Sequence, residues 1–262
     1  MKLVFIGTGS AFTVGGNYNS NMYFEADNGK RLLLDCGCDV RHALHELGLD
    51  QNAFEAVYIS HLHADHVGGM EWLAFKTMFD PNSSHRVDLY CADTMVKPLW
   101  NILSGGLCSL EHVEANLTSY FNVKSIVPNG HFNWQGVKFN LFQTVHQISN
   151  SHIVPSFGLE ALIDGLHVVV STDTKFPRNN DEALLKLYDT ADIIFHDCET
   201  CSFKSNVHAH FSELATLDPS IKRKMWLYHY QPGELPDARK EGFRGFVKKG
   251  QCFDFKNPKT LI

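Results

Sequence analysis

The stretch ISHLHADHVGG, from Ile59 to Gly69, places three histidines and an aspartate within six positions. Side chains two apart on an extended segment point the same way, so His61 and His63 can bind one ion. Asp65 and His66 begin the following turn and can reach a second ion. Imidazole and carboxylate suit zinc, and manganese or iron with less preference. A polar loop with surface histidines is the alternative, but this spacing after an apolar run is typical of a metal site.

Length and composition favour one globular unit with a substantial core. The chain has 262 residues, of which 44% are hydrophobic, and it contains no linker, repeat or low-complexity tract. We therefore expect a single domain over residues 1–262. The formal net charge of -6 argues against an extended basic surface for long nucleic acids. It leaves room for a small anionic substrate, which needs only a local pocket.

The cysteines and the amino terminus indicate a reduced compartment. The apolar start MKLVFIG is interrupted at once by GTGS and is too short for a secretory signal. No apolar run approaches the length of a membrane span. We expect a cytosolic protein with free thiols and no membrane partner. Four of the cysteines could instead form a structural zinc site: Cys36, Cys38, Cys198 and Cys201. The first pair is separated by a single residue, a spacing that suits zinc poorly, so we expect buried free thiols.

Strand and helix patterns alternate along the whole chain. Asn28-Gly29 and Asp164-Gly165 predict hairpin turns between apolar runs. The runs FEAVYIS, RVDLYCA, VKFNLFQTV, LHVVVST, ADIIFHD and KMWLYHY predict strands, and VRHALHELGL, MEWLAFKTMF and DEALLKLY predict helices. Pro98 weakens the helix prediction for TMVKPLWNIL. Two runs of strands, each followed by helices, predict an α/β fold in which two sheets pack face to face with helices outside.

The clustered histidines resemble the defining motif of the metallo-β-lactamase superfamily, whose fold is an αββα sandwich of two mixed sheets. The resemblance extends over nearly the whole chain, because three further residues follow in the order of the family's ligands: His146 in FQTVHQ, Asp173 in VVVSTDT and His229 in WLYHY. A lone histidine after a strand is more often structural or exposed. Matches in the right order, each at the end of an apolar strand, favour ligands.

The resemblance implies a two-metal site. One ion would be held by His61, His63 and His146. The other would be held by Asp65, His66 and His229, with Asp173 between the two ions. Two divalent ions about 3.5–4 Å apart lower the pKa of a bridging water and bind phosphoryl oxygens, and Asp65 can orient that water. The expected cofactor is two divalent ions, zinc first and manganese as the alternative.

Two further segments resemble the ribonuclease Z-like phosphodiesterase branch of the superfamily: FIGTGSAF and FHDCETCSF…HAHFSEL. In that branch an acid after the penultimate strand pairs with a histidine that opens a helix and protonates the leaving oxygen. The resemblance implies Asp197 as the acid and His210 as the histidine, in a His-x-Ser arrangement with Ser212. His208 is the alternative, because HAH offers two candidates.

The substrate implied by the resemblance is small. Members that process tRNA carry a long arm between the His146-type and Asp173-type positions. Here that interval is nearly filled by two strands and a hairpin. The remaining resemblance, on STDTK, HDCE and HAHFSEL, is to the compact anti-Pycsar phosphodiesterases of phages and bacteria. It implies hydrolysis of 3′,5′-cyclic mononucleotides to nucleoside monophosphates, which defeats antiphage signalling, by a cytoplasmic homodimer (in the host cytoplasm if phage-encoded).

Three other functions stay open at this point. One is a ribonuclease Z-like RNA 3′-processing endonuclease, which needs a basic surface. Another is a thioester or lactone hydrolase with the same metals. The third is a non-catalytic binding module, for which a broken ligand set is expected. Candidate substrate contacts lie in a polar loop after the first strand, which suits a phosphate or a base edge: Tyr18, Asn19, Ser20 and Asn21. Lys175, two residues past Asp173, is a further candidate, because it could place a positive charge near a phosphate.

Overall fold

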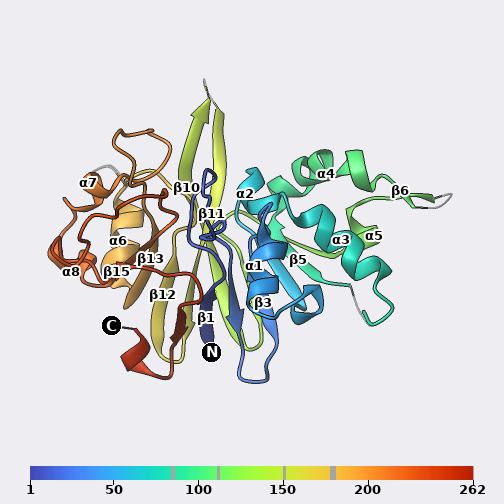
Figure 1. Cartoon of the computed structure of the whole chain (residues 1–262), viewed down its shortest axis with the longest axis horizontal. Helices are drawn as coiled ribbons and strands as arrows, with labels where there is room; N and C mark the ends of the chain where they lie inside the picture. Colours follow the sequence, from blue (N-terminus) through green and yellow to red (C-terminus); the bar gives the residue numbers. More distant parts are fainter. Residues whose placement is uncertain (84–85, 111–112, 150–151, 178–180, 262) are drawn as a thin grey trace.

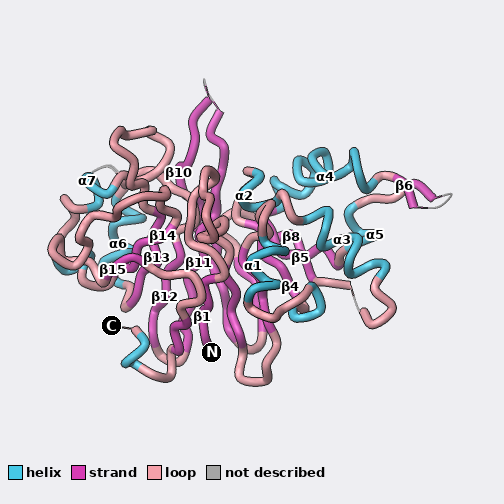
Figure 2. The backbone as a smooth tube through the Cα atoms, viewed as in Figure 1, coloured by secondary structure: helices cyan, strands magenta, loops and turns pink. Residues whose placement is uncertain are grey.

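Two seven-stranded mixed sheets pack against each other with helices on their outer faces (Figure 1 and Figure 2), as predicted. The structure is a computed structural model that describes residues 1–83, 86–110, 113–149, 152–177 and 181–261. Within these ranges, no helix is both long and apolar enough to cross a lipid bilayer.

The first sheet has the strand order β16-β1-β2-β3-β4-β5-β8. Its strands are β1 (Lys2–Phe5), β2 (Met22–Glu25), β3 (Arg31–Leu34), β4 (Ala56–Ile59), β5 (Asp88–Ala92), β8 (Asn122–Ile126) and β16 (Cys252–Asp254). The pairs from β3 to β8 are parallel and the others antiparallel. The helices between these strands are α1 (Val40–Glu46), η1 (Gln51–Ala53), α2 (Ala64–Val67), α3 (Met70–Phe79), α4 (Asp93–Leu107) and α5 (Leu117–Tyr120). The short strands β6 (Ser109–Leu110) and β7 (Val113–Glu114) pair only with each other among the described strands.

The second sheet has the order β15-β14-β13-β12-β11-β10-β9. Its strands are β9 (His131–Trp134), β10 (Val137–Ser149), β11 (His152–Ile163), β12 (Leu166–Val170), β13 (Ile193–Asp197), β14 (Met225–Tyr228) and β15 (Gly245–Phe246). Strands β12 to β15 are parallel. The accompanying helices are α6 (Glu182–Thr190), α7 (Phe211–Leu214), α8 (Pro219–Lys222) and η2 (Pro258–Thr260).

Both predicted hairpin turns are confirmed. Met22 pairs with Leu34 and Glu25 with Arg31 around the Asn28-Gly29 turn. Ile163 pairs directly with Leu166, so Asp164 and Gly165 form a two-residue turn. Both have positive φ, 50° and 85°, which is the conformation that two-residue hairpins require.

Aromatic side chains from both sheets fill the space between them. The ring centroids of Phe5 in β1 and Phe195 in β13 are 5.5 Å apart. Those of Phe24 in β2 and Phe139 in β10 are 5.1 Å apart. Aromatic packing of this kind buries a large apolar area and favours defined ring geometries. It fixes the two sheets relative to each other, and therefore fixes the strand ends that carry the predicted ligands.

The helix containing Pro98 is longer than predicted and continues through the proline. Proline removes one backbone N–H and so one bond of the helix. Pro98 and Thr94 are both exposed, so water can bind the carbonyl left without its partner. Met95 and Leu99 on the opposite face are buried, and their packing stabilises the helix.

The cysteines are less buried than predicted. All seven lie in the described ranges and are free thiols. Cys36 and Cys198 are buried, but Cys38 is exposed and Cys201 is half-buried. None of the four belongs to the metal-type clusters found among the described residues, which disfavours the structural zinc alternative.

Candidate metal centre

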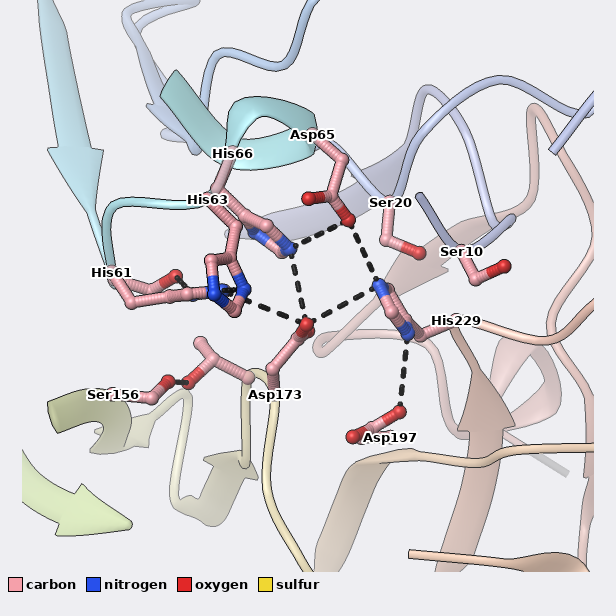
Figure 3. Close-up of polar contacts among 12 residues, drawn as sticks. Ser10, Ser20, His61, His63, Asp65, His66, Ser156, Asp173, Asp197 and His229 are labelled. Atoms are coloured by element: carbon pink, nitrogen blue, oxygen red, sulfur yellow. Dashed lines mark hydrogen bonds and ion pairs between the residues drawn. The ribbon is translucent and has the colours of Figure 1, made fainter. Parts of the chain in front are cut away.

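The seven predicted ligands converge in one place, and Figure 3 labels all of them except His146. Their ligand atoms form two clusters, each within 4.8 Å, that share Asp173. The first cluster contains His61, His63, His146 and Asp173, and the second contains Asp65, His66, Asp173 and His229. All of them except His63 are buried. The structure thus brings together the two ligand sets that the sequence predicted.

Three imidazole nitrogens approach one point in the first cluster. His63 Nδ1 lies 3.1 Å from His61 Nε2 and 3.0 Å from His146 Nε2. Burial lowers the pKa of His146 to about 4 and that of His61 well below its ordinary value. Both imidazoles are therefore neutral near pH 7, which is the form that binds a metal.

A β-bulge directs His146 into this cluster. The pairing of β10 with β11 shifts register between Val145 and Gln147, so His146 is the extra residue. A bulge of this kind bends the strand and changes the direction of a side chain. The strand pattern around FQTVHQ predicted a histidine near the strand end, but regular alternation cannot predict the bulge.

The second cluster alternates imidazole and carboxylate groups. Asp173 Oδ2 lies 3.3 Å from both His66 Nε2 and His229 Nε2. Asp65 Oδ2 lies 3.2 Å from His66 Nε2 and 3.3 Å from His229 Nε2. Burial lowers the pKa of His66 and of His229, but the carboxylates, Asp173 first, outweigh burial and raise both pKa values well above the ordinary value. The carboxylates thus favour positive charge at this position, which a divalent cation would supply.

Unpaired buried atoms support the same interpretation. Among the described residues, Asp173 Oδ1 is buried and has no hydrogen-bond partner, and His66 Nε2 lies near two carboxylates without the geometry of a hydrogen bond to either. Unpaired buried polar atoms are unfavourable and uncommon, and they are expected where side chains serve as metal ligands. Imidazole and carboxylate donors in two adjoining clusters therefore suit two divalent ions.

Asp35 is a functional residue that the sequence interpretation missed. Its Oδ2 lies 2.8 Å from His66 Nδ1 and accepts a hydrogen bond of 2.7 Å from Ser60 Oγ. Ser60 Oγ is also 3.1 Å from His61 Nδ1. Such outer partners fix the tautomer and the ring orientation of ligating histidines. The sequence did carry a signal for this residue, because Asp35 directly follows the apolar run LLL at a strand end.

Three residues at the centre have backbone conformations that are uncommon outside glycine. Asp35, Thr172 and His229 have φ values of 60°, 53° and 64°. Residues in the left-handed region carry strain and concentrate at functional sites. Here each one adjoins a strand end and turns the chain so that a site residue enters the cluster.

The predicted pairing of Asp197 with His210 is wrong. His208 Nδ1 lies 2.7 Å from Asp197 Oδ2, so the alternative histidine occupies this position. His210 is instead the N-cap of α7: its Nδ1 accepts from the backbone N–H of Ser212 at 3.2 Å. Its Nε2 lies 2.9 Å from the carbonyl oxygen of Cys201. The resemblance favoured His210 and kept His208 as the alternative, but the start of α7 at Phe211 puts His210 in the capping position.

Asp197 connects His208 to the metal centre. Its other oxygen, Oδ1, lies 3.2 Å from His229 Nδ1, and Oδ2 accepts a hydrogen bond from the backbone N–H of Thr174 at 2.9 Å. Burial raises the pKa of Asp197, but His208 outweighs it and the pKa is about 2. Burial lowers the pKa of His208, and Asp197 in turn raises it above the ordinary value. The pair therefore combines a carboxylate with an imidazole that readily carries a proton.

The five residues predicted to contact substrate do not line the cavity of about 490 Å³ that opens beside the first cluster. Ser20 Oγ donates to the carbonyl of Gly9, and Asn21 Oδ1 accepts from the N–H of Gly37. Asn19 donates its N–H to Asp39, and the Tyr18 hydroxyl donates to Glu46. The backbone N–H of Lys175 donates to the carbonyl of Val145. The polar groups of residues 18–21 thus shape their own loop.

A cavity of about 490 Å³ opens beside the first cluster and His208. His63, His146 and His208 line it, and Gln147 of β10 and residues of three loops supply the rest. Phe12 and Phe203 line it from different loops and are 83% and 67% exposed. A larger depression of about 700 Å³ near Trp226 contains no residue of the two clusters. The smaller cavity is therefore the one that a substrate of this centre would enter.

Comparisons with known proteins agree with this arrangement. A family profile described as "Anti-Pycsar protein Apyc1" matches residues 1–253. The Anti-Pycsar protein Apyc1 of Paenibacillus harenae is 37% identical over 238 residues, covering 88% of this chain and 90% of that protein. The protein of the same name from Bacillus phage 010DV004 is 33% identical over 263 residues, covering 97% and 98%.

The fold has a solved counterpart. The metallo-β-lactamase fold protein YhfI from Bacillus subtilis superposes with a TM-score of 0.74 at 18% identity, covering 96% of this chain and 98% of that chain. This likeness confirms the predicted fold, and the profile and the two relatives identify the group within it. The chain belongs to the family of Anti-Pycsar protein Apyc1 and has the metallo-β-lactamase fold.

Proposed function

We propose that this chain is a metal-dependent phosphodiesterase that hydrolyses 3′,5′-cyclic mononucleotides to nucleoside monophosphates. One observation carries the proposal: two histidine and aspartate clusters share Asp173 and adjoin a paired aspartate and histidine. The relatives' name, Anti-Pycsar protein, supports a cyclic nucleotide as substrate. We further propose that the activity removes the nucleotide signal of an antiphage defence in the cytoplasm.

The clusters supply the means of attack on phosphorus. Two bound divalent ions, zinc first and manganese as the alternative, would polarise the phosphoryl oxygens and lower the pKa of a bridging water. Asp65 is placed to accept a hydrogen bond from the attacking water and so orient it. Asp173 lies within 3.8 Å of His61, His66, His146 and His229, which suits a ligand shared between two ions.

The pair of Asp197 and His208 serves the leaving group. As the water oxygen bonds to phosphorus, one ribose oxygen leaves with the electron pair of its P–O bond. His208 donates its proton to this oxygen as general acid. Asp197 accepts a hydrogen bond from Nδ1 of His208, so Nε2 is the atom that faces the substrate. His208 thus takes the role that the sequence assigned first to His210.

The cavity supports a small substrate with an aromatic base. Its volume of about 490 Å³ lies within the range of small-ligand sites, roughly 300–1,000 Å³. Phe12 and Phe203 offer exposed rings at this cavity, and bases stack on such rings. The chain between His146 and Asp173 forms the end of β10 and all of β11 and β12, which supports the absence of a tRNA-binding arm. We also propose that the protein is a homodimer, and this part of the proposal rests on the family resemblance alone.

The test is a substrate panel. Purified protein is assayed with purine and pyrimidine 3′,5′-cyclic nucleotides, a precursor tRNA and bis(p-nitrophenyl) phosphate at two ionic strengths. We expect efficient opening of cyclic nucleotides that depends weakly on salt, since one phosphate is neutralised. Strongly salt-dependent tRNA cleavage with inert cyclic nucleotides would support the RNA endonuclease instead. Inactivity on every phosphodiester, with turnover of a thioester or lactone, would support the third class of hydrolase.

A further inference from the structure

Ser10 is a cavity-lining residue whose buried hydroxyl group pairs with no protein group in the described ranges. Ser10 is 2% exposed, and its Oγ has no hydrogen-bond partner in the part of the chain that the structure describes. It lines the same cavity as His63, His146 and His208. Figure 3 draws its side chain in the same view as the ligands. An unpaired buried hydroxyl is unfavourable, so its place at the cavity points to a ligand.

The backbone of Ser10 is held firmly while its side chain is unused. Its N–H donates to the carbonyl of Tyr230 at 3.2 Å, and its carbonyl accepts from the N–H of Thr13 at 3.0 Å. Asn19 Nδ2 donates to the same carbonyl at 3.3 Å. Tyr230 directly follows the ligand His229. The backbone position of Ser10 is therefore tied to the segment that carries His229.

Ser20 provides an internal comparison. It lies in the same loop, is 1% exposed, and is drawn with Ser10 in Figure 3. Its hydroxyl donates a hydrogen bond of 3.0 Å to the carbonyl of Gly9, so it has a structural use. The two buried serines thus differ in two respects: the Ser20 hydroxyl is paired and lies off the cavity, whereas the Ser10 hydroxyl is unpaired and its residue lines the cavity.

We propose that Ser10 is a substrate-binding residue whose hydroxyl donates a hydrogen bond to one non-bridging phosphoryl oxygen. A hydroxyl donates one hydrogen bond, and O–H groups bind anionic oxygens with short, strong bonds. The inference rests on the proposed function for the identity of the substrate. It requires only that the cavity receive a phosphodiester.

Ser10→Ala and Ser20→Ala form the matched pair that tests this assignment. We expect Ser10→Ala to lower kcat/KM for a cyclic nucleotide by about 10- to 100-fold, the usual range for a hydrogen bond to a charged group. Its melting temperature and metal content should equal those of the wild type, because the hydroxyl has no protein partner to lose. Ser20→Ala should lower the melting temperature, because it leaves the carbonyl of Gly9 unpaired.

Phosphorothioate cyclic nucleotides separate binding from structure. Sulfur accepts hydrogen bonds poorly, so one diastereomer already lacks the Ser10 contact. The ratio of wild-type to Ser10→Ala activity should be near one for that diastereomer and large for the other and for the oxygen substrate. Equal ratios for all three, or a lowered melting temperature of Ser10→Ala, would overturn the assignment.

The same pair distinguishes a failure of this inference from a failure of the proposed function. If the wild type does not open cyclic nucleotides, the proposed function fails. Bis(p-nitrophenyl) phosphate then replaces the cyclic nucleotide, since it keeps the phosphodiester without base or ribose. A selective loss with Ser10→Ala on this compound supports the phosphoryl contact, and an unchanged rate refutes it.

Discussion

Replacing His208 with alanine should slow the opening of a cyclic nucleotide by about 10²–10⁴-fold, the range for a lost general acid. The variant removes an imidazole whose Nδ1 lies 2.7 Å from Asp197 Oδ2. Asp197 keeps its hydrogen bond from the N–H of Thr174 and its contact with His229. His208 joins Asp173, Asp197 and His229 in a third group of ligand-type atoms, but all seven predicted ligands remain in the variant, so we expect metal content near that of the wild type.

His210→Ala is the control, because it removes a histidine two residues away. His210 caps α7, and loss of a cap costs about 0.5–2 kcal/mol of stability. We therefore expect His210→Ala to lower the melting temperature and to leave kcat on cyclic nucleotides within about threefold of the wild type, far from the loss expected for a general acid. A loss of activity as deep as that of His208→Ala would return the acid to His210.

The leaving group and the pH profile identify the role of His208. Bis(p-nitrophenyl) phosphate needs no proton on its leaving group, so His208→Ala should largely spare it. A general acid must be protonated, so activity should fall as pH rises through the pKa of His208. Asp197 raises that pKa above its ordinary value of 6.5, so Asp197→Asn should move this alkaline fall to lower pH. Equal losses of activity on both substrates, or an alkaline fall that stays at the same pH in Asp197→Asn, would refute the assignment.

Two other predictions concern the cavity and the ligand shell. Phe12→Ala and Phe203→Ala should each raise KM by about 5- to 100-fold if the rings stack on the base. Phe79, an exposed residue on α3, is the control, and its replacement by alanine should leave KM unchanged. An unchanged KM in both cavity variants would refute the aromatic subsite. Asp35→Asn should weaken metal affinity by about 10- to 100-fold in a chelator competition, because it alters the partner of His66 Nδ1. Asparagine also tolerates the positive φ of residue 35, so the backbone is kept. A metal affinity equal to that of the wild type would mean that this contact does not tune the site.

The residues that lie at strand ends were predictable from sequence. An apolar run fixes where a strand stops, and the side chain that follows lies at the sheet edge, as His61, Asp173 and His229 do. His146 was identified by the same rule, but β10 continues beyond it to Ser149, so it lies within the strand and not at its end. Its direction depends on a bulge, which single-residue periodicity does not encode.

The residues supplied by loops were not predictable in this way. Ser10, Phe12 and Phe203 meet at one cavity from segments almost 200 positions apart, and only tertiary packing brings them together. The predicted contacts Asn19, Ser20 and Asn21 are polar and close in sequence to the site, but their hydrogen bonds hold the loop itself. Residues 1–262 as a single domain likewise remain a prediction.

Metal stoichiometry tests the central claim most directly. The purified wild type, His63→Ala and the exposed-surface control His42→Ala are analysed for bound metal and for activity in parallel. His63 Nδ1 lies within 3.1 Å of two other imidazole nitrogens, whereas His42 is exposed on α1. We expect about two divalent ions per chain in the wild type and in His42→Ala, and loss of metal together with activity in His63→Ala. One ion per chain, or none, in a fully active wild type would contradict the two-metal account.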